Sequence, residues 1–219
     1  MPINIFFGIN LASRRDCSMI KTIISDLGKV ILFFDNKIFY TRISQFSPYS
    51  PERVAELVRL NFNLVQSFDK GEMSPHDFYK NVSDMLKVEI DYERFYEIYN
   101  DVFSLNSSVL EIYKKLKPRL RLMLCSNTDV MRFGFIKKRY PSILIFHEYI
   151  LSYEVGWMKP HPQIYRAALK KAQAKAEECV FIDDLKENIE AAEILGIKGI
   201  LFGPQTNLEE SLRKVGVDL

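Results

Sequence analysis

Several side chains that could do chemistry stand at the ends of short apolar runs that predict buried strands. They are Asp26 after the run 19–25, Ser126-Asn127 after 120–125 and Asp183-Asp184 after 179–182, with Lys159 in a loop between a strand and a helix. Because open parallel sheets bind ligands at the carboxyl ends of their strands, we expect these side chains to meet at one sheet edge.

The residue types at this edge indicate a particular chemistry. Carboxylates that converge on one point raise each other's pKa unless a cation neutralises them, and hard oxygen ligands at this density suit Mg²⁺. A lysine beside hydroxyl and amide donors could hold the oxygens of a phosphoryl group while one carboxylate attacks the phosphorus in line. The pattern therefore predicts a magnesium-dependent phosphoryl-transfer site.

Each of these residues also has a purely structural explanation. Asp26 is consistent with a turn residue before Gly28, Asp183-Asp184 with helix N-caps, and the run 126–129 with a capping sequence. Lys159 on its own is consistent with a solvated loop lysine. Considered singly, the structural explanations are favoured, but the occurrence of all four groups on one predicted edge favours a site.

Strand and helix patterns alternate along most of the chain. Predicted strands cover 19–25, 120–125, 149–153, 179–182 and 198–202, with helices between them over 129–140, 161–174 and 186–195 and a further helix ending at 116. This alternation predicts an α/β fold, a Rossmann-like doubly wound parallel sheet covered by helices. Between about 40 and 103 the pattern changes to amphipathic helices over 52–62, 74–86 and 92–103, which indicates a small helical insert.

Composition excludes several classes of protein. The 219 residues are 47% hydrophobic, enough for a packed core, and their net charge of +2 includes no basic stripe for nucleic acid. No apolar run approaches the roughly 20 residues that span a bilayer, so we expect no membrane association. Cys17, Cys125 and Cys179 lack the close pairs of zinc or redox sites, which predicts a reducing, cytoplasmic environment.

Four motifs, in this order, resemble those of the haloacid dehalogenase superfamily. They are Ser-Asp-Leu-Gly-Lys-Val at 25–30, Leu-Cys-Ser-Asn-Thr at 124–128, Gly-Trp-Met-Lys-Pro-His-Pro at 156–162, and Phe-Ile-Asp-Asp at 181–184 followed by Asn188. The resemblance spans about 19–202. It is greatest to the phosphatases that have a helical cap after the first motif, especially the glucose-1-phosphatase-like type, whose first motif reads Asp-Leu-Gly.

The resemblance implies a division of the chain into parts. A haloacid dehalogenase-like α/β core would comprise 19–36 and 106–219, and an α-helical cap would occupy 37–105. Residues 1–18 would form an N-terminal extension of uncertain structure. The protein would be a monomer or a homodimer that acts on a small phosphorylated metabolite.

The resemblance also implies a metal site. Asp26 would ligate Mg²⁺ as well as act as the nucleophile that forms an aspartyl-phosphate, and Gly28 would offer its backbone carbonyl to the metal. Asp184 would be a direct metal ligand, whereas Asp183 would bind the metal either directly or through water.

For the phosphoryl group, the resemblance implies three further roles. Ser126 and Asn127 would hydrogen-bond its oxygens, and Lys159 would neutralise their charge while it orients the nucleophile. The implied function is a Mg²⁺-dependent phosphatase, with sugar phosphates among its candidate substrates. Two alternatives stay open: a metal-independent hydrolytic haloacid dehalogenase, and a non-catalytic binding or regulatory protein of the same fold.

The chain departs from the commonest pattern of the superfamily at Gly28, where many members have an aspartate as general acid. Because a positioned acid contributes about 10²–10⁴-fold, we expect a preference for good leaving groups such as anomeric sugar phosphates. Asp35 is a candidate substitute acid, although it also suits the start of the first helix of the insert. Trp157 and the aromatic residues of the insert would either form hydrophobic core or line a sugar-binding face.

Overall fold

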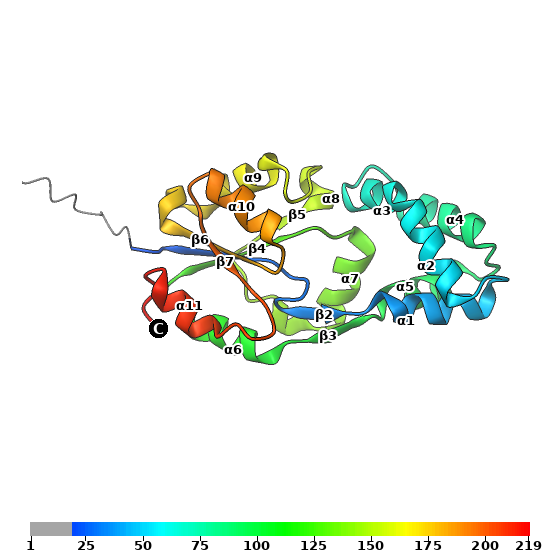
Figure 1. Ribbon diagram of the computed structural model, residues 1–219, viewed down its shortest axis with the longest axis horizontal. Helices are drawn as coiled ribbons and strands as arrows, with labels where there is room; N and C mark the ends of the chain where they lie inside the picture. The colour runs from blue at the N-terminus through cyan, green and yellow to red at the C-terminus, as the bar shows by residue number, and fades with distance from the viewer. Residues whose placement is uncertain (1–18) are drawn as a thin grey trace, which may run out of the picture.

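The computed structural model describes residues 19–219, so the expected extension 1–18 and Cys17 lie outside the described residues. A five-stranded sheet with the order β5-β4-β1-β6-β7 forms its centre (Figure 1). All neighbouring pairs are parallel, which confirms the expected α/β class. The strands are β1 (Thr22–Ser25), β4 (Arg121–Ser126), β5 (Glu148–Leu151), β6 (Cys179–Asp183) and β7 (Lys198–Leu201).

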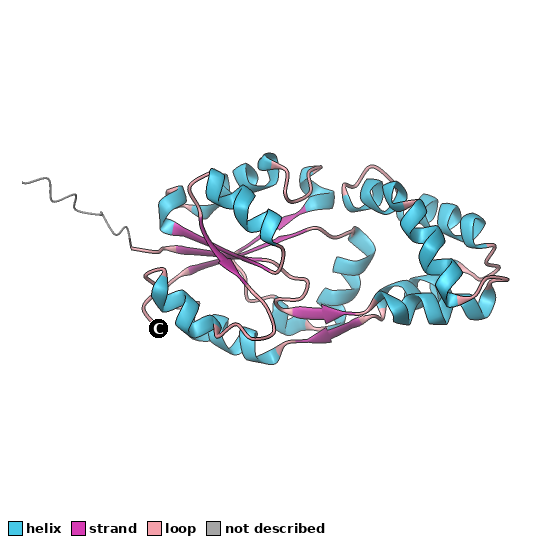
Figure 2. Cartoon of the chain, viewed as in Figure 1, coloured by secondary structure: helices cyan, strands magenta, loops and turns pink. Residues whose placement is uncertain are grey.

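Helices cover both faces of this sheet, as Figure 2 shows. The larger ones are α6 (Ser107–Leu116), α7 (Val130–Arg139), α9 (Pro162–Ala172), α10 (Lys186–Ile194) and α11 (Leu208–Lys214). Short helical segments in the connections are η2 (Pro141–Ile143), α8 (Ser152–Val155) and η3 (Ala176–Glu178). None of the helices formed by residues 19–219 is long and apolar enough to cross a lipid bilayer.

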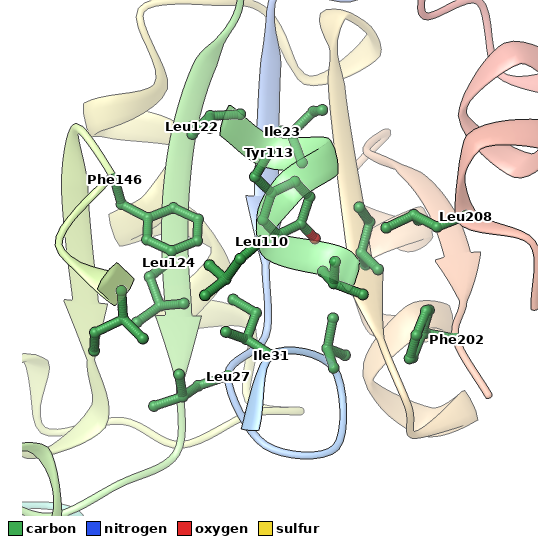
Figure 3. Close-up of a cluster of buried hydrophobic side chains, with 14 of the residues drawn as sticks. Ile23, Leu27, Ile31, Leu110, Tyr113, Leu122, Leu124, Phe146, Phe202 and Leu208 are labelled. Carbon is green, nitrogen blue, oxygen red and sulfur yellow. The ribbon is translucent and has the colours of Figure 1, made fainter. Parts of the chain in front are cut away.

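Alternation of side chains along the strands builds two hydrophobic clusters, one on each face. Ile23 of β1 belongs to the cluster under α6, whose Tyr113 lies beside it in Figure 3. The next residue, Ile24, belongs to the opposite cluster, which packs against α9 and α10. Strands buried on both faces read as continuous apolar runs, and for this reason the sequence predicts them well.

The end of β1 is fixed from three sides. β1 pairs with β4 and with β6, in registers that place Ser25 beside Leu124 and Ile182. The Tyr113 hydroxyl donates to Ser25 Oγ over 2.8 Å, and the Asp26 N–H donates to the Ile182 carbonyl over 2.8 Å. The carboxyl ends of β1, β4 and β6 therefore lie side by side.

A two-stranded antiparallel ribbon links the sheet to the helical insert. It consists of β2 (Leu32–Phe34) and β3 (Phe103–Leu105), neither of which we expected. The helix predicted over 92–103 ends at Asn100, and the residues after it form β3. Three-residue strands are stabilised by a partner distant in sequence, so periodicity alone cannot reveal them. Helix α11 was not predicted either.

A third hydrophobic cluster lies in the insert and includes Phe39, Phe68, Phe78 and Phe95. The elements of the insert are α1 (Asn36–Ile43), η1 (Ser44–Phe46), α2 (Pro51–Leu60), α3 (Phe62–Asp69), α4 (Pro75–Leu86) and α5 (Tyr92–Asn100). The helix expected over 52–62 ends at Leu60, and α3 begins at Phe62. Ser74 and Asp91 cap α4 and α5 by accepting backbone hydrogen bonds, as their spacing predicts.

Buried polar residues join the insert to the core between α3, α5 and α7. The Tyr99 hydroxyl donates to Asp129 Oδ2 over 2.8 Å, and the Arg132 guanidinium lies 4.5 Å from the centroid of the Tyr99 ring. Asp69 is 8% exposed, and its Oδ1 has no hydrogen-bond partner among the described residues. Burial and the Asp129 carboxylate raise the pKa of Asp69 to about 7, although Arg132 acts in the opposite direction.

We predict that Asp69→Asn stabilises the protein at pH 8 and stabilises it much less at pH 5. The native state holds a proton on Asp69 that the unfolded chain loses near pH 4, so the native state loses stability as the pH rises from about 4 to 7. At roughly 1.4 kcal/mol per pKa unit, the gain at pH 8 should be about 2–4 kcal/mol.

Urea unfolding at the two pH values measures this effect. The exposed Asp84 in the same insert provides the control, since Asp84→Asn should shift both free energies of unfolding equally. An equal effect of Asp69→Asn at pH 5 and pH 8 would contradict the assignment.

Candidate active site

One buried ammonium group holds two carboxylates at the carboxyl edge of the sheet. Lys159 Nζ lies 2.6 Å from Asp26 Oδ1 and 2.6 Å from Asp183 Oδ2. The three residues are 5%, 7% and 0% exposed, in the order Lys159, Asp26, Asp183. The structure thus brings together residues from the end of β1, the end of β6 and the loop before α9.

The two carboxylates differ in how they are held. Asp183 Oδ1 accepts hydrogen bonds from the Asn188 side chain and the Leu185 backbone N–H, each over 2.9 Å. Burial raises the pKa of Asp26 to about 6, because the Asp183 charge adds to burial while Lys159 opposes both. Burial would lower the pKa of Lys159, but Asp26 and Asp183 raise it above its ordinary value. Near neutral pH the site therefore contains an ionised Asp26 and a charged Lys159.

The loop that carries Lys159 is fixed by Asn127. The Asn127 side-chain amide donates to the Lys159 carbonyl over 2.8 Å and accepts from the Lys159 backbone N–H over 2.7 Å. Both polar atoms of the Asn127 side chain are therefore used to position Lys159. The expected contact of Asn127 with a phosphoryl group stays a prediction.

Ser126 is the last residue of β4 and is 3% exposed. Its hydroxyl makes a long contact of 3.5 Å with the Asn127 carbonyl. A hydrogen bond of this length is weak, so the hydroxyl can turn toward a ligand at little cost.

The acidic residues form a donor set that suits a hard divalent cation. One oxygen each of Asp26, Asp183 and Asp184 lies within 4.8 Å of the others. Lys159 neutralises only part of this charge. Three carboxylates with excess negative charge fit Mg²⁺, which prefers oxygen ligands and retains several waters.

Gly28 leaves little space for a side chain. A Cβ at this position would lie 3.1 Å from Cε1 of Phe34 and 3.9 Å from Asp26 Oδ2. The Phe34 ring thus lies against the position where many members of the superfamily place a general acid. Asp35, the candidate substitute acid, caps α1, and its carboxylate accepts the Lys37 N–H over 2.9 Å.

The aromatic candidates and Cys125 lie in surroundings that indicate packing roles or ring stacking. Phe39, Phe78 and Phe95 lie in the core of the insert, which agrees with the core explanation for the aromatic residues. Trp157 is 45% exposed and stacks on His161 with ring centroids 4.1 Å apart. Burial raises the pKa of the Cys125 thiol to about 12, so this thiol is not activated as a nucleophile.

Sequence reasoning missed Lys29 as a site residue. Its Nζ lies 3.3 Å from Asp184 Oδ2, and its backbone φ of +55° is in the left-handed region. A charged residue three positions after Asp26 is a signal, but its partner is 155 residues away in sequence. Only the fold reveals the pair.

Comparisons with known proteins bear on the family and the fold of this chain. Residues 20–196 match the family model described as haloacid dehalogenase-like hydrolase. The chain is 26% identical over 199 residues to D-ribitol-5-phosphate phosphatase of Bacteroides thetaiotaomicron, covering 87% of this chain and 95% of that protein.

Two further similarities bear on the fold. Drimenol cyclase drtB of Aspergillus calidoustus is 21% identical over 90% of the chain, which spans only 37% of that protein. The solved structure of the HAD family enzyme BT-2542 from Bacteroides thetaiotaomicron, in complex with magnesium and inorganic phosphate, has a TM-score of 0.79 and 23% identity. The match covers 89% of this chain and 100% of the BT-2542 chain, so the two proteins share a fold.

We predict that Asn127→Ala loosens the loop around Lys159. Loss of both hydrogen bonds leaves two backbone groups without partners, so the free energy of unfolding should fall by about 1–3 kcal/mol. Hydrogen exchange at the Lys159 backbone N–H should also accelerate.

Asn61→Ala provides the control for this variant. Asn61 caps the end of α2, where its exposed side-chain amide donates to the Leu57 carbonyl. The control should therefore leave exchange at Lys159 unchanged. Wild-type protection of the Lys159 N–H in Asn127→Ala would show that the amide does not hold the loop.

Proposed function

This chain belongs to the haloacid dehalogenase-like hydrolase family, and on that premise we propose that it is a Mg²⁺-dependent phosphatase of small phosphorylated metabolites. The observation that carries the proposal is the buried Lys159 ammonium 2.6 Å from both Asp26 and Asp183, with Asp184 beside them. The similar D-ribitol-5-phosphate phosphatase and the magnesium and phosphate complex of BT-2542 support it.

The first step is attack by Asp26. The pKa of its carboxylate is about 6, so the carboxylate is ionised at neutral pH. Lys159 fixes the direction of one of its oxygens. The other oxygen forms a bond to phosphorus while the bond from phosphorus to the leaving oxygen breaks, and the leaving oxygen keeps the electron pair. No carboxylic acid stands at position 28, so the leaving oxygen takes its proton from water.

The second step releases phosphate. A water molecule adds to phosphorus, the bond between phosphorus and Asp26 breaks, and the carboxylate is restored as inorganic phosphate leaves. Lys159 and the Ser126 hydroxyl hold phosphoryl oxygens through both steps. Asp26, Asp183 and Asp184, together with the Gly28 carbonyl, would hold Mg²⁺, which supplies positive charge to the phosphoryl oxygens when it is bound.

The substrate is a monoester with a small organic group. D-ribitol 5-phosphate, for which the similar phosphatase is named, is an ester of a primary alcohol and hence has a poor leaving group. The glycine at position 28 favours the opposite class, the anomeric sugar phosphates, whose leaving oxygens need less assistance. The proposed substrates are therefore sugar and polyol phosphates, with anomeric esters hydrolysed faster.

The rival functions have less support. A hydrolytic dehalogenase needs no metal, whereas this chain has Asp184 beside the other two carboxylates. A non-catalytic binding protein has no need for an attacking carboxylate fixed by a buried lysine, a costly arrangement to maintain.

We predict that Asp26→Asn abolishes release of inorganic phosphate from a panel of phosphorylated metabolites. The amide cannot form the acyl phosphate, so the rate should fall by more than about 10³-fold. EDTA should also abolish the wild-type activity, and Mg²⁺ should restore it.

A malachite green assay measures both effects, and Asp35→Asn is the control. Because Asp35 caps α1, its exchange should change turnover by only a few-fold. Activity that persists in EDTA would favour the dehalogenase alternative, and full activity of Asp26→Asn would exclude the proposed nucleophile.

We further predict that the ratio kcat/KM is at least about tenfold higher for glucose 1-phosphate than for glucose 6-phosphate, since no acid at position 28 assists the leaving oxygen. The two substrates share the same sugar and charge and differ in the oxygen that leaves phosphorus, and steady-state kinetics compares them. Equal values would mean that another residue supplies the proton.

A further inference from the structure

The ammonium of Lys29 lies on the carboxylate that the metal site needs. Lys29 Nζ is 3.3 Å from Asp184 Oδ2, and the side chains are 54% and 16% exposed, respectively. Asp26 and Asp183 share Lys159, whereas the salt bridge of Asp184 among the described residues is to Lys29. The edge thus has two ammonium groups, one buried between carboxylates and one at the outer side.

The turn directs Lys29 toward this position. Its φ of +55° is a conformation that costs a side-chain-bearing residue energy, and its N–H donates to the Leu32 carbonyl over 2.7 Å. The Nζ atom also lies 5.9 Å from the centroid of the Phe34 ring. The chain therefore keeps a lysine in a strained turn where its ammonium meets Asp184.

Lys29 and Asp184 face an open hollow. The hollow has a volume of about 760 Å³, and its lining also includes Phe33, Asn106 and Phe202. Because the Lys29 side chain is half-exposed and borders this space, the ammonium can leave Asp184 without unfolding any element. The hollow also gives a hydrated cation access to Asp184.

We propose that Lys29 is a built-in competitor of the divalent cation at Asp184. Its ammonium neutralises the Asp184 carboxylate, and it has to withdraw or share that carboxylate when a dication binds. Lys29 thereby weakens Mg²⁺ binding and eases release of the metal. This inference rests on the proposed function, since it concerns the cation of that same site.

Isothermal titration of MgCl₂ into the metal-free full-length protein tests the inference without substrate. Lys29→Gln removes the charge and keeps a polar side chain that is only one atom shorter, so Mg²⁺ should bind about tenfold more tightly. Lys29→Arg keeps the charge and should bind Mg²⁺ within about twofold of the wild type. Glycine adopts a φ of +55° without strain, so Lys29→Gly is a folded variant without the charge. It should bind Mg²⁺ as tightly as Lys29→Gln does.

Lys186→Gln is the matched control. Lys186 is also exposed and also pairs over 3.3 Å, but with Glu190 on its own helix, so its removal tests for a general effect of charge near Asp184. Affinity in this variant should change by less than about twofold. An equal gain in Lys29→Gln and Lys186→Gln would overturn the specific competition, as would weaker or unchanged binding in Lys29→Gln and Lys29→Gly.

The outcomes separate this inference from the proposed function. Wild-type protein that binds Mg²⁺ and releases phosphate, with no gain in the Lys29 variants, refutes the competitor and leaves the phosphatase intact. Binding that is seen only in the variants without the charge supports the competitor and counts against a Mg²⁺-dependent wild-type phosphatase. Absence of binding in every variant refutes both.

Discussion

The ion triad of Asp26, Lys159 and Asp183 is the interaction on which the site depends. Charges this deeply buried are costly unless each is paired at close range, and here a single ammonium contacts two carboxylates. The triad can form only if the ends of β1 and β6 are adjacent and the loop before α9 returns to them. The sheet order β4-β1-β6, the Tyr113 hydrogen bond to Ser25 and the Asn127 amide under the loop together meet that requirement.

The balance of charge at this edge explains its chemistry. Three carboxylates exceed the one buried ammonium, and the difference favours a divalent cation. The same excess of negative charge accounts for the salt bridge between Lys29 and Asp184. Burial, with the charge of Asp183 added to it, raises the pKa of Asp26 to about 6, low enough for ionisation near neutral pH. The nucleophile, the metal ligands and the competing lysine are therefore consequences of one electrostatic arrangement.

Sequence patterns predicted the parts of this protein that depend on local order along the chain. Asp26 and Asp183 were found because each follows a buried strand, and parallel strands deliver their carboxyl ends to one edge. The partners of Asn127 and Lys29 were not found, since each pairing joins segments far apart in sequence. The ribbon of β2 and β3 was not predicted from the sequence for the same reason. The buried cluster around Asp129 likewise depends on how α5 packs against α7, which no periodicity encodes.

The most direct test of the account is to trap the covalent intermediate on Asp26. Protein quenched during turnover with Mg²⁺ and treated with borohydride should contain homoserine at position 26, because an aspartyl-phosphate is reduced to that residue, and mass spectrometry of the peptide should detect it. The modification should be absent without Mg²⁺. Steady release of phosphate with no modification at position 26, or with reduction at another carboxylate, would contradict the assignment of Asp26 as the nucleophile held by Lys159.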